Sequence, residues 1–462
     1  MNIEILEGNP FANDELNRED SAKVLTQFVC SANQPLVICI DAPWGQGKTT
    51  FLLMWEQYLK DQNIPTIYFN AWENDFTDDA LVSLIGEIGF AVDRLAKPEN
   101  AHKAHEYLDK AKKLGIGLIK RSIPVAAKIV TAGALDLDQA TEEAFATLSE
   151  SVAKEQLDKY EKSKNSLIAF RTSLAELASS FDNAEDKKPL IFIIDELDRC
   201  RPTFSIELLE KVKHFFNVKN IVFVLGADKD QLSHAIRAVY GAGLDTNGYL
   251  RRFIDFDYLL PLPERGLFLK ALFKSYGFNE YFSSKKAYSI NYEREQALAV
   301  FGDLFEIYQL TLREQQHCCS LLNVCIKTTP SNNKLFPIFL CYLIVQKIKK
   351  PELYKQIVHE SIQLACLVDM LAELPGGKKL LETKYGVVLE AYIVDSNSGR
   401  SEYENIIQNY EIIGSASSEA SLVEKQRANS IARLMSDHDW DGGNETLRYL
   451  INKMEIASRF KS

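Results

Sequence analysis

Five short apolar runs, separated by longer segments with helical periodicity, limit most strongly how this chain can fold. The runs lie at residues 36–41, 66–70, 190–195, 221–226 and 254–260. The first four are typical of strands buried on both faces, because they are short and lack the alternation of a half-exposed strand. The fifth is a further candidate strand, in which apolar residues alternate with Asp255 and Asp257. Between the runs, apolar residues recur at spacings of three and four, as at Phe170, Leu174 and Leu177. This alternation predicts an α/β fold with a parallel five-stranded sheet flanked by helices.

The spacing of these runs also predicts how the chain is divided. About 120 residues separate the second run from the third, whereas a helical crossover needs roughly a dozen. We therefore expect a helical insertion at about residues 98–164, inside an N-terminal domain of residues 1–265. Strand patterns fade after this domain, and turn-rich breaks divide the rest. We expect an all-α C-terminal half, with a helical lid at residues 266–350 and a C-terminal helical domain at residues 351–462.

Composition and charge narrow the class of protein. Hydrophobic residues make up 46% of the chain and charged residues 25%, which is typical of a soluble globular protein. The formal net charge of −11 argues against a surface that is basic everywhere and coats nucleic acid. One basic block, with seven Lys/Arg against two acidic residues, lies at residues 102–130. Contact with nucleic acid through residues 103–128 therefore stays open.

Targeting and membrane signals are weak. Residues 1–4 lack the basic start and apolar core of a signal peptide, and the eight cysteines form no paired framework, which fits a reduced cytosol. Residues 114–135 are apolar, but Lys120, Arg121 and Lys128 interrupt them. The uncharged stretches fall far short of the ~18 residues that a spanning helix needs. We expect a cytoplasmic protein with no transmembrane segment.

A glycine-containing loop follows the first run and precedes a helical pattern at residues 51–59. The loop consists of Ala42, Pro43, Trp44, Gly45, Gln46, Gly47, Lys48, Thr49 and Thr50. It matches the phosphate-loop pattern G-x-x-x-x-G-K-[ST], except that Ala42 replaces the first glycine. In such a loop the glycines let backbone N–H groups surround a phosphate. Lys48 would bridge the β- and γ-phosphates, and the Thr49 hydroxyl would bind Mg²⁺.

Two other interpretations of this loop are a dinucleotide fingerprint and a chance turn. A dinucleotide fingerprint is excluded, because its third glycine is missing and it has no place for Lys48 and Thr49. A chance Gly-Lys-Thr turn is the remaining alternative. The strand pattern before the loop and the helical pattern after it favour a phosphate-binding loop.

Two acidic residues, Asp195 and Glu196, end the third run. At the carboxyl edge of a parallel sheet, the first acid can hold Mg²⁺ together with Thr49. The second can act as the general base that polarises the attacking water. A solvated turn or a helix cap would show the same pair, but the presence of Lys48 favours the catalytic interpretation. These motifs predict a hydrolase that binds a nucleoside triphosphate with Mg²⁺.

Three further strings resemble the KAP family of P-loop NTPases: Asn-Ala-Trp-Glu at residues 70–73, the segment at 193–200 and the segment at 224–228. With the long insertion, this resemblance covers roughly residues 10–345. It implies an ATPase with a five-stranded parallel sheet, as in AAA-type and STAND ATPases, in which the acidic strand lies beside the phosphate-loop strand. Many members carry membrane helices in the insertion, and the charged segment of this chain does not support carrying that feature over.

The resemblance also implies roles for two acids near the nucleotide. Asp198 would lie in a loop beside the γ-phosphate, with a structural ion pair between Asp198 and Arg199 as the alternative. Asp228 would sense the γ-phosphate at the end of the fourth strand. It could equally cap the helix at residues 231–240, and both roles can coexist.

Three arginines complete the set that the resemblance implies. Arg251 and Arg252 precede the fifth run, where related ATPases present an arginine finger to the phosphate of a neighbouring subunit. An exposed, charged helix end would look the same in the sequence. Arg313 resembles the arginine of a helical lid that contacts nucleotide.

The residues and the resemblance together predict an ATP-binding and ATP-hydrolysing switch ATPase that controls its helical C-terminal half. The resemblance makes bacterial antiphage defence the expected setting, with a homo-oligomer and a companion effector protein. Two alternatives stay open: a nucleic-acid-stimulated motor or clamp ATPase, and a slow, nucleotide-loaded scaffold. The presence of Glu196 argues against a pure scaffold.

One cluster of residues that often bind metals lies in the C-terminal half. His317, Cys318, Cys319 and Cys325 share one predicted helix. Structural zinc sites draw on paired ligands from two segments, and no second pair is present in the pattern. The cluster therefore predicts buried cysteines that pack as small apolar residues.

Overall fold

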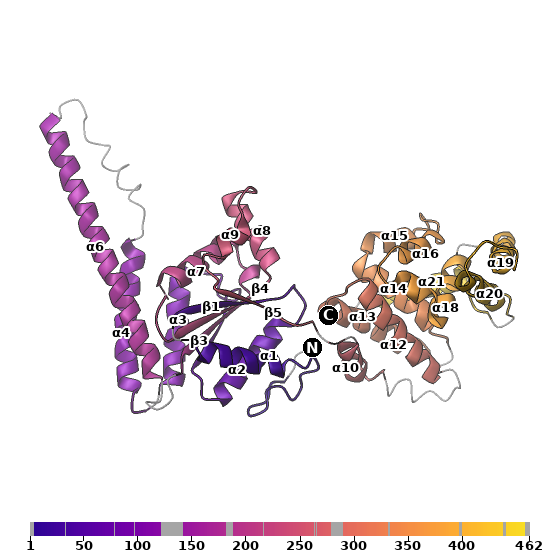
Figure 1. Ribbon diagram of the computed structural model, residues 1–462, viewed down its shortest axis with the longest axis horizontal. Helices are drawn as coiled ribbons and strands as arrows, with labels where there is room; N and C mark the ends of the chain where they lie inside the picture. The colour runs from indigo at the N-terminus through magenta and orange to yellow at the C-terminus, as the bar shows by residue number, and fades with distance from the viewer. Residues whose placement is uncertain are drawn as a thin grey trace. The chain divides into compact units, whose positions relative to one another are not determined.

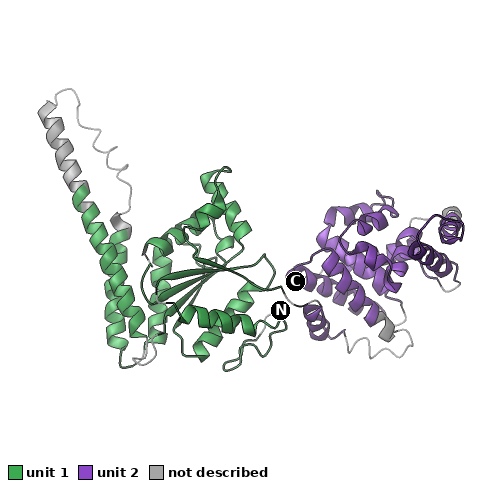
Figure 2. Cartoon of the chain, in the orientation of Figure 1, with its two compact units in different colours: residues 1–262 green, residues 263–462 purple. Residues whose placement is uncertain are grey.

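The computed structural model of the chain describes residues 4–32, 34–77, 79–96, 98–121, 142–181, 188–215, 217–262, 264, 266–278, 290–330, 333–396, 400–437 and 440–457. The chain forms two compact units, Met1–Leu262 and Pro263–Ser462 (Figure 2). The predicted domain bounds, including the division at residue 350, stay predictions.

A five-stranded sheet lies at the centre of the first unit (Figure 1). Its strands are β1 (Leu36–Asp41), β2 (Thr66–Asn70), β3 (Leu190–Asp195), β4 (Ile221–Ala227) and β5 (Phe256–Leu259). They lie in the order β2-β3-β4-β1-β5, and every neighbouring pair is parallel. The predicted parallel α/β sheet is therefore confirmed.

One expectation about the sheet is wrong. The resemblance places the acidic strand beside the phosphate-loop strand, whereas β4 lies between β3 and β1 and pairs with both. The physical reason lies in the composition of β4. Each of its residues is buried, so a central position with a paired strand on either side removes the most apolar surface and satisfies its backbone.

Helices cover both faces of the sheet, because successive side chains of a strand point to opposite faces. Ile38 and Ile193 pack with α1 and α2 on one face, and Phe192 and Phe223 pack with α3, α7 and α8 on the other. The helices of this layer are α1 (Glu19–Cys30), α2 (Lys48–Asp61), α3 (Ala80–Leu95), α7 (Pro202–Phe215), α8 (Lys229–Tyr240) and α9 (Thr246–Leu250), with a 3-10 turn η2 (Leu197–Arg199).

The predicted helical insertion is also confirmed. It contains α4 (Ala101–Arg121) and the first part of α6 (Glu142–Ser180), which pack side by side (Figure 1). Leu108 of α4 and Phe170 of α6 join the same apolar cluster as α3, so the base of the insertion is anchored on the sheet domain. Residues 122–141, which include Lys128, lie outside the described part of the chain. No helix in the described part is long and apolar enough to cross a membrane.

The second unit is helical in all its described elements. They are α10 (Leu267–Ser275), α12 (Ile290–Ile307), α13 (Leu312–Lys327), α14 (Pro337–Lys349), α15 (Pro351–Val358), α16 (Cys366–Ala372), α17 (Gly377–Leu381), α18 (Lys384–Asp395), α19 (Arg400–Gly414), α20 (Leu422–Met435) and α21 (Asn444–Ala457). The first ten residues of α14 are all buried, so this helix forms the centre of one apolar cluster. The predicted all-α half is confirmed.

The clustered cysteines belong to this core. Cys318, Cys319 and Cys325 are fully buried, and burial raises the pKa of each thiol. Within the described residues, no group of three or more His, Cys, Asp or Glu is placed to hold a metal ion. These cysteines pack as apolar residues, as predicted.

Gly226 provides a test of how tightly β4 is packed beside the acidic strand. A Cβ at this position would lie 2.5 Å from Leu52 Cδ1 and 2.6 Å from Asp195 Oδ1. We expect Gly226→Ala to lower the free energy of unfolding by about 1–3 kcal/mol through overpacking, measured by urea denaturation followed by circular dichroism. The control is Gly243→Ala, where a Cβ meets nothing within 4 Å and only a small change is expected. Equal stability of the two variants would contradict the packing described.

Candidate functional site

The loop at residues 42–47 connects the end of β1 to the start of α2. Gly45 and Gly47 have φ values of +81° and +75°, in the left-handed region that glycine adopts without steric cost. Helix α2 begins at Lys48, so its first N–H groups have no acceptor inside the helix and point toward the loop. This backbone forms a concave set of donors that suits an anion.

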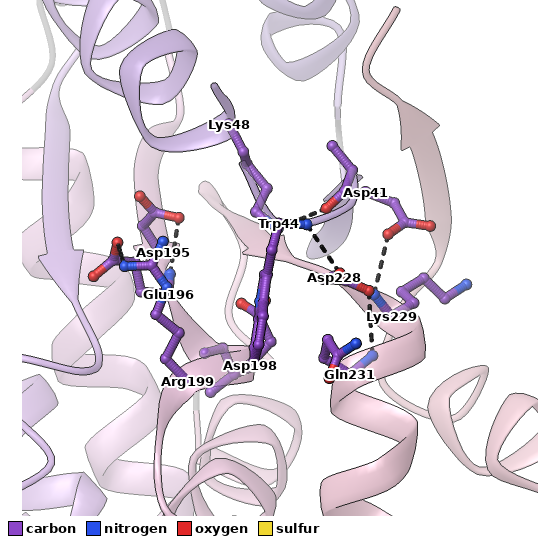
Figure 3. Close-up of polar contacts among 12 residues, drawn as sticks. Asp41, Trp44, Lys48, Asp195, Glu196, Asp198, Arg199, Asp228, Lys229 and Gln231 are labelled. Carbon is purple, nitrogen blue, oxygen red and sulfur yellow. Dashed lines mark hydrogen bonds and ion pairs between the residues drawn. The ribbon is translucent and has the colours of Figure 1, made fainter. Parts of the chain in front are cut away.

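Lys48 is buried at the base of this loop, with 8% of its surface exposed. Its Nζ donates to the Ala42 carbonyl at 3.0 Å and lies 3.8 Å from Asp198 Oδ2 (Figure 3). The indole N–H of Trp44 donates to the same Asp198 oxygen. The structure therefore pairs Asp198 with the loop, not with Arg199, and Lys48 is held by groups that are weaker partners than phosphate oxygens.

Asp195, at the end of β3, is fully buried. Its Oδ2 accepts from the Tyr68 hydroxyl at 2.9 Å, and its Oδ1 accepts from the Glu196 N–H at 2.8 Å. Burial raises the pKa of Asp195, while hydrogen bonds from Thr49 and Tyr68 lower it in part. A buried carboxylate beside a threonine hydroxyl is a pair of hard oxygen donors of the kind that Mg²⁺ takes.

Glu196 follows with a φ of +61°, a left-handed conformation that is uncommon for a residue with a side chain. Its Oε2 accepts from Asn70 Nδ2 at 3.2 Å, and its Oε1 accepts from the Thr49 hydroxyl at 3.4 Å. The Arg199 guanidinium forms an ion pair with it and lies 5.9 Å from the centre of the Trp72 ring. The Glu196 carboxylate is thus held by groups from three elements: β2, the start of α2 and the turn after β3.

Asp228 ends β4 and makes two kinds of contact. Its Oδ1 accepts from the N–H groups of Asp230 and Gln231, which confirms that it caps α8. Its Oδ2 accepts from the N–H of Trp44 at 3.1 Å, which connects the loop at residues 42–47 to the end of β4 (Figure 3). A contact between Asp228 and nucleotide stays a prediction.

Arg251 and Arg252 lie away from this cluster. Both are exposed and follow α9, and the N–H of Asp255 donates to the Val37 carbonyl near the start of β1. The loop leaves the other end of β1, four residues on, which is about 13 Å along the strand. The two arginines are therefore at the opposite edge of the sheet from Lys48. Arg313 is exposed on α13, in the second unit.

Three residues near the acidic pair were not predicted as site residues. Tyr68 and Asn70 come from β2, and Arg199 comes from the turn after β3. The sequence signal for Arg199 was present, because a residue three positions after Glu196 on a helical turn faces it. Asn70 belongs to a string that carries the family resemblance, but no role followed from it. Tyr68 carried no local signal, since the sequence does not say that β2 lies beside β3.

Comparison with known proteins gives a match to one family. The P-loop domain of the KAP family matches residues 18–323. No curated protein matches the sequence significantly. Among solved structures, the ORC2 protein of Aeropyrum pernix, described as ADPNP-ADP complexes, is similar with a TM-score of 0.34 and 12% identity, over 96% of this chain and 95% of that one.

The raised pKa of Asp195 has a consequence for stability. Because the fold favours the neutral acid, wild-type stability falls as pH rises from below the ordinary value of 3.8 through the raised one. Asp195→Asn removes the charge, keeps an oxygen for the Glu196 N–H and offers an NH₂ to the Tyr68 hydroxyl. We therefore expect the variant to have a higher free energy of unfolding than wild type near pH 7, where it carries no buried charge at this position.

This gain should shrink as pH falls, and urea denaturation without nucleotide at several pH values measures it. The exposed Asp20→Asn serves as the control and should change stability little at any pH. A variant that is less stable than wild type throughout this range would show that the carboxylate charge is satisfied by the fold.

Proposed function

Because this chain belongs to the KAP family of P-loop NTPases, we propose that it binds ATP with Mg²⁺, hydrolyses it, and uses the nucleotide state to switch its helical C-terminal half. One observation carries the proposal. The loop after β1, the acids after β3 and Asp228 after β4 converge at one carboxyl edge of the parallel sheet. This is where parallel sheets bind ligands.

The phosphates would enter the set of N–H groups around Gly45 and Gly47. Lys48 would exchange its two present partners, the Ala42 carbonyl and Asp198, for β- and γ-phosphate oxygens. The exchange is favourable because charged phosphate oxygens are stronger acceptors than the neutral Ala42 carbonyl, and Asp198 lies at the long distance of 3.8 Å. Pro43, Trp44, Gln46 and Thr50 complete the loop that surrounds the phosphates.

Thr49 and Asp195 are the residues that would hold Mg²⁺. The carboxylate of Asp195 is fully buried, and this burial raises its pKa. A bound cation would stabilise the charged form that burial disfavours. Bound Mg²⁺ would neutralise charge on the phosphates during transfer. Thr49 and Asp195 would orient it, with other ligands from phosphate and water.

Glu196 would serve as the general base for the attacking water. At present its carboxylate oxygens are engaged by the ion pair with Arg199 and the hydrogen bond from Asn70, so they are not free to accept a proton from water. Hydrolysis then requires Arg199 to release Glu196 in the loaded site. Asp198 and Asp228, which both contact Trp44, would respond to the γ-phosphate through the loop.

The biological setting in this proposal is a cytoplasmic antiphage defence system in which the ATPase controls a companion effector protein. Membership of the family supports the ATPase part of this proposal. The defence role is a further step of the proposal. Arg251 and Arg252 would act in a homo-oligomer, and Arg313 would contact nucleotide from the helical lid.

A nucleic-acid-stimulated motor is the second candidate. The described part of the basic block presents Lys103, Lys110 and Lys113 on the exposed side of α4, which favours contact with phosphates. Glu106 and Asp109 are exposed on the same helix and weaken that field. ATPase rates with and without DNA or RNA separate this candidate from the first, and rates that do not respond to either polymer would exclude it.

Two substitutions separate binding from chemistry. Lys48→Ala should weaken ATP binding at least tenfold, because a charge-assisted contact to the phosphates is lost. Glu196→Gln should keep binding and lower the hydrolysis rate by roughly 10²–10⁴, because an amide cannot accept the proton of water. Calorimetry measures the affinity and phosphate release measures the rate. Lys23→Ala, at an exposed lysine of α1, is the control. Wild-type affinity in Lys48→Ala would overturn the loop assignment, and full turnover in Glu196→Gln would move the base elsewhere.

The arginine pair predicts activity across subunits. Because Arg251 and Arg252 lie at the edge opposite Lys48, they can reach a γ-phosphate only in a neighbouring chain. The hydrolysis rate per chain should rise with protein concentration. It should fall by roughly 10³ when both arginines are replaced by alanine. Mixing that variant with Glu196→Gln should restore part of the activity. Arg94→Ala, at an exposed arginine of the same unit, should change nothing. A concentration-independent rate without restoration would exclude a trans role.

A further inference from the structure

Arg18 is a buried cation with no catalytic assignment. It stands immediately before α1 and has 4% of its surface exposed. Its backbone N–H donates to Asp14, whereas its guanidinium donates to three backbone carbonyls. Burial lowers the pKa of Arg18 to about 10, and Asp14 offsets this only in part. A charged group this deeply buried is expensive unless its position serves the structure around it.

Two of the carbonyls belong to the loop that would hold the phosphates. Arg18 Nη2 donates to the Gln46 carbonyl at 2.8 Å, and Nη1 donates to the Gly47 carbonyl at 3.2 Å. For backbone N–H groups to face an anion in this loop, the carbonyls must turn the other way. The guanidinium lies on that other side and gives these carbonyls a charged donor. It therefore stabilises the loop in its anion-binding conformation.

The third carbonyl belongs to a distant part of the chain. The same Nη2 donates to the Pro261 carbonyl at 3.3 Å, two residues after β5 ends and two residues before the second unit begins. Next to it, the Leu260 N–H donates to the Asp41 carbonyl at 3.0 Å, at the end of β1. The last segment of the first unit, residues 260–262, which we call the exit segment, is thus bonded both to β1 and to Arg18. The Arg18 guanidinium joins the loop to this exit segment.

We propose that Arg18 is a positioning residue that couples occupancy of the loop at residues 42–49 to the order of the exit segment at residues 260–262. The inference rests on the proposed function, because the ligand in the loop is ATP. An anion in the loop compensates the desolvated charge of Arg18 and fixes the Gln46 and Gly47 carbonyls. Arg18 Nη2 is then fixed as well, and with it the bond to Pro261. The C-terminal half receives the nucleotide state through the chain that leads into it.

The planar fork is essential to this role. One ammonium group on a flexible stem keeps the charge but cannot hold three carbonyls in fixed directions. Arg18→Lys should therefore keep part of the nucleotide affinity and lose the coupling. Arg18→Gln removes the charge and should also weaken binding roughly tenfold, as expected for loss of a bond to a charged group.

Hydrogen exchange of the full-length chain, with and without Mg²⁺ and the slowly hydrolysed analogue ATPγS, tests the coupling. In wild type, the nucleotide should slow exchange in peptides covering residues 44–50 and also at the N–H of Leu260, which donates to the Asp41 carbonyl. The slowing should approach ~100-fold for ligand at 100 times its Kd. At saturating ligand, Arg18→Lys should keep protection at 44–50 and lose it at Leu260. Arg94→Lys, at an exposed arginine, should behave as wild type.

The outcomes are distinguishable. If residues 44–50 of wild type gain no protection, nucleotide binding itself fails. If they gain protection and Leu260 does not, the coupling is refuted and the proposed function stands. The wild-type measurement decides this even if both Arg18 variants fold poorly. Variants that fold and protect both residues 44–50 and Leu260 as wild type does would reduce Arg18 to a structural contact.

Discussion

Parallel pairing of β3, β4 and β1 is the constraint on which the site depends. In this register Asp195 lies opposite Gly226, and Asp41 lies opposite Ala227, so three strands end at one level. Everything that follows the strands is therefore gathered at one edge. Gly226 leaves the space that the Asp195 carboxylate occupies, since a side chain there would meet it at 2.6 Å. The sheet thus sets both the place and the spacing of the acidic groups.

The charges at this edge are unequal and explain its present contacts. The carboxylates of Asp195, Glu196 and Asp198 are all buried, while Lys48 and Arg199 supply the nearby positive charge. The site without ligand distributes these cations among the acids. A divalent cation would add positive charge beside the buried Asp195 carboxylate. A polyphosphate would add negative charge beside Lys48 and the N–H groups of the loop. The arrangement is therefore suited to taking both ligands together.

The sequence predicted the parts of the site that depend on neighbours in the chain. Lys48 and Thr49 follow a strand in a local pattern, and Asp195 and Glu196 end a buried run, so their positions at a strand end needed no knowledge of the sheet. Strand order was beyond that reasoning, because five apolar runs of similar length have no pattern that selects neighbours. For the same reason Tyr68 and the role of Asn70 were missed. Arg18 lies 28 residues before Gln46, and no local spacing connects them.

Trp44 gives the chain an optical signal of its own. Its indole is half exposed at the mouth of the loop and bonded to Asp198, the same carboxylate that lies near Lys48. Of the four tryptophans, Trp55 is fully buried between α2 and α1, where a ligand at the sheet edge leaves its surroundings unchanged. Arrival of phosphates would alter both the solvent and the hydrogen bond of Trp44. Trp72, whose ring centre lies 5.9 Å from the Arg199 guanidinium, would add to the same change. The emission of the unlabelled protein would therefore record how fast the whole site fills and empties.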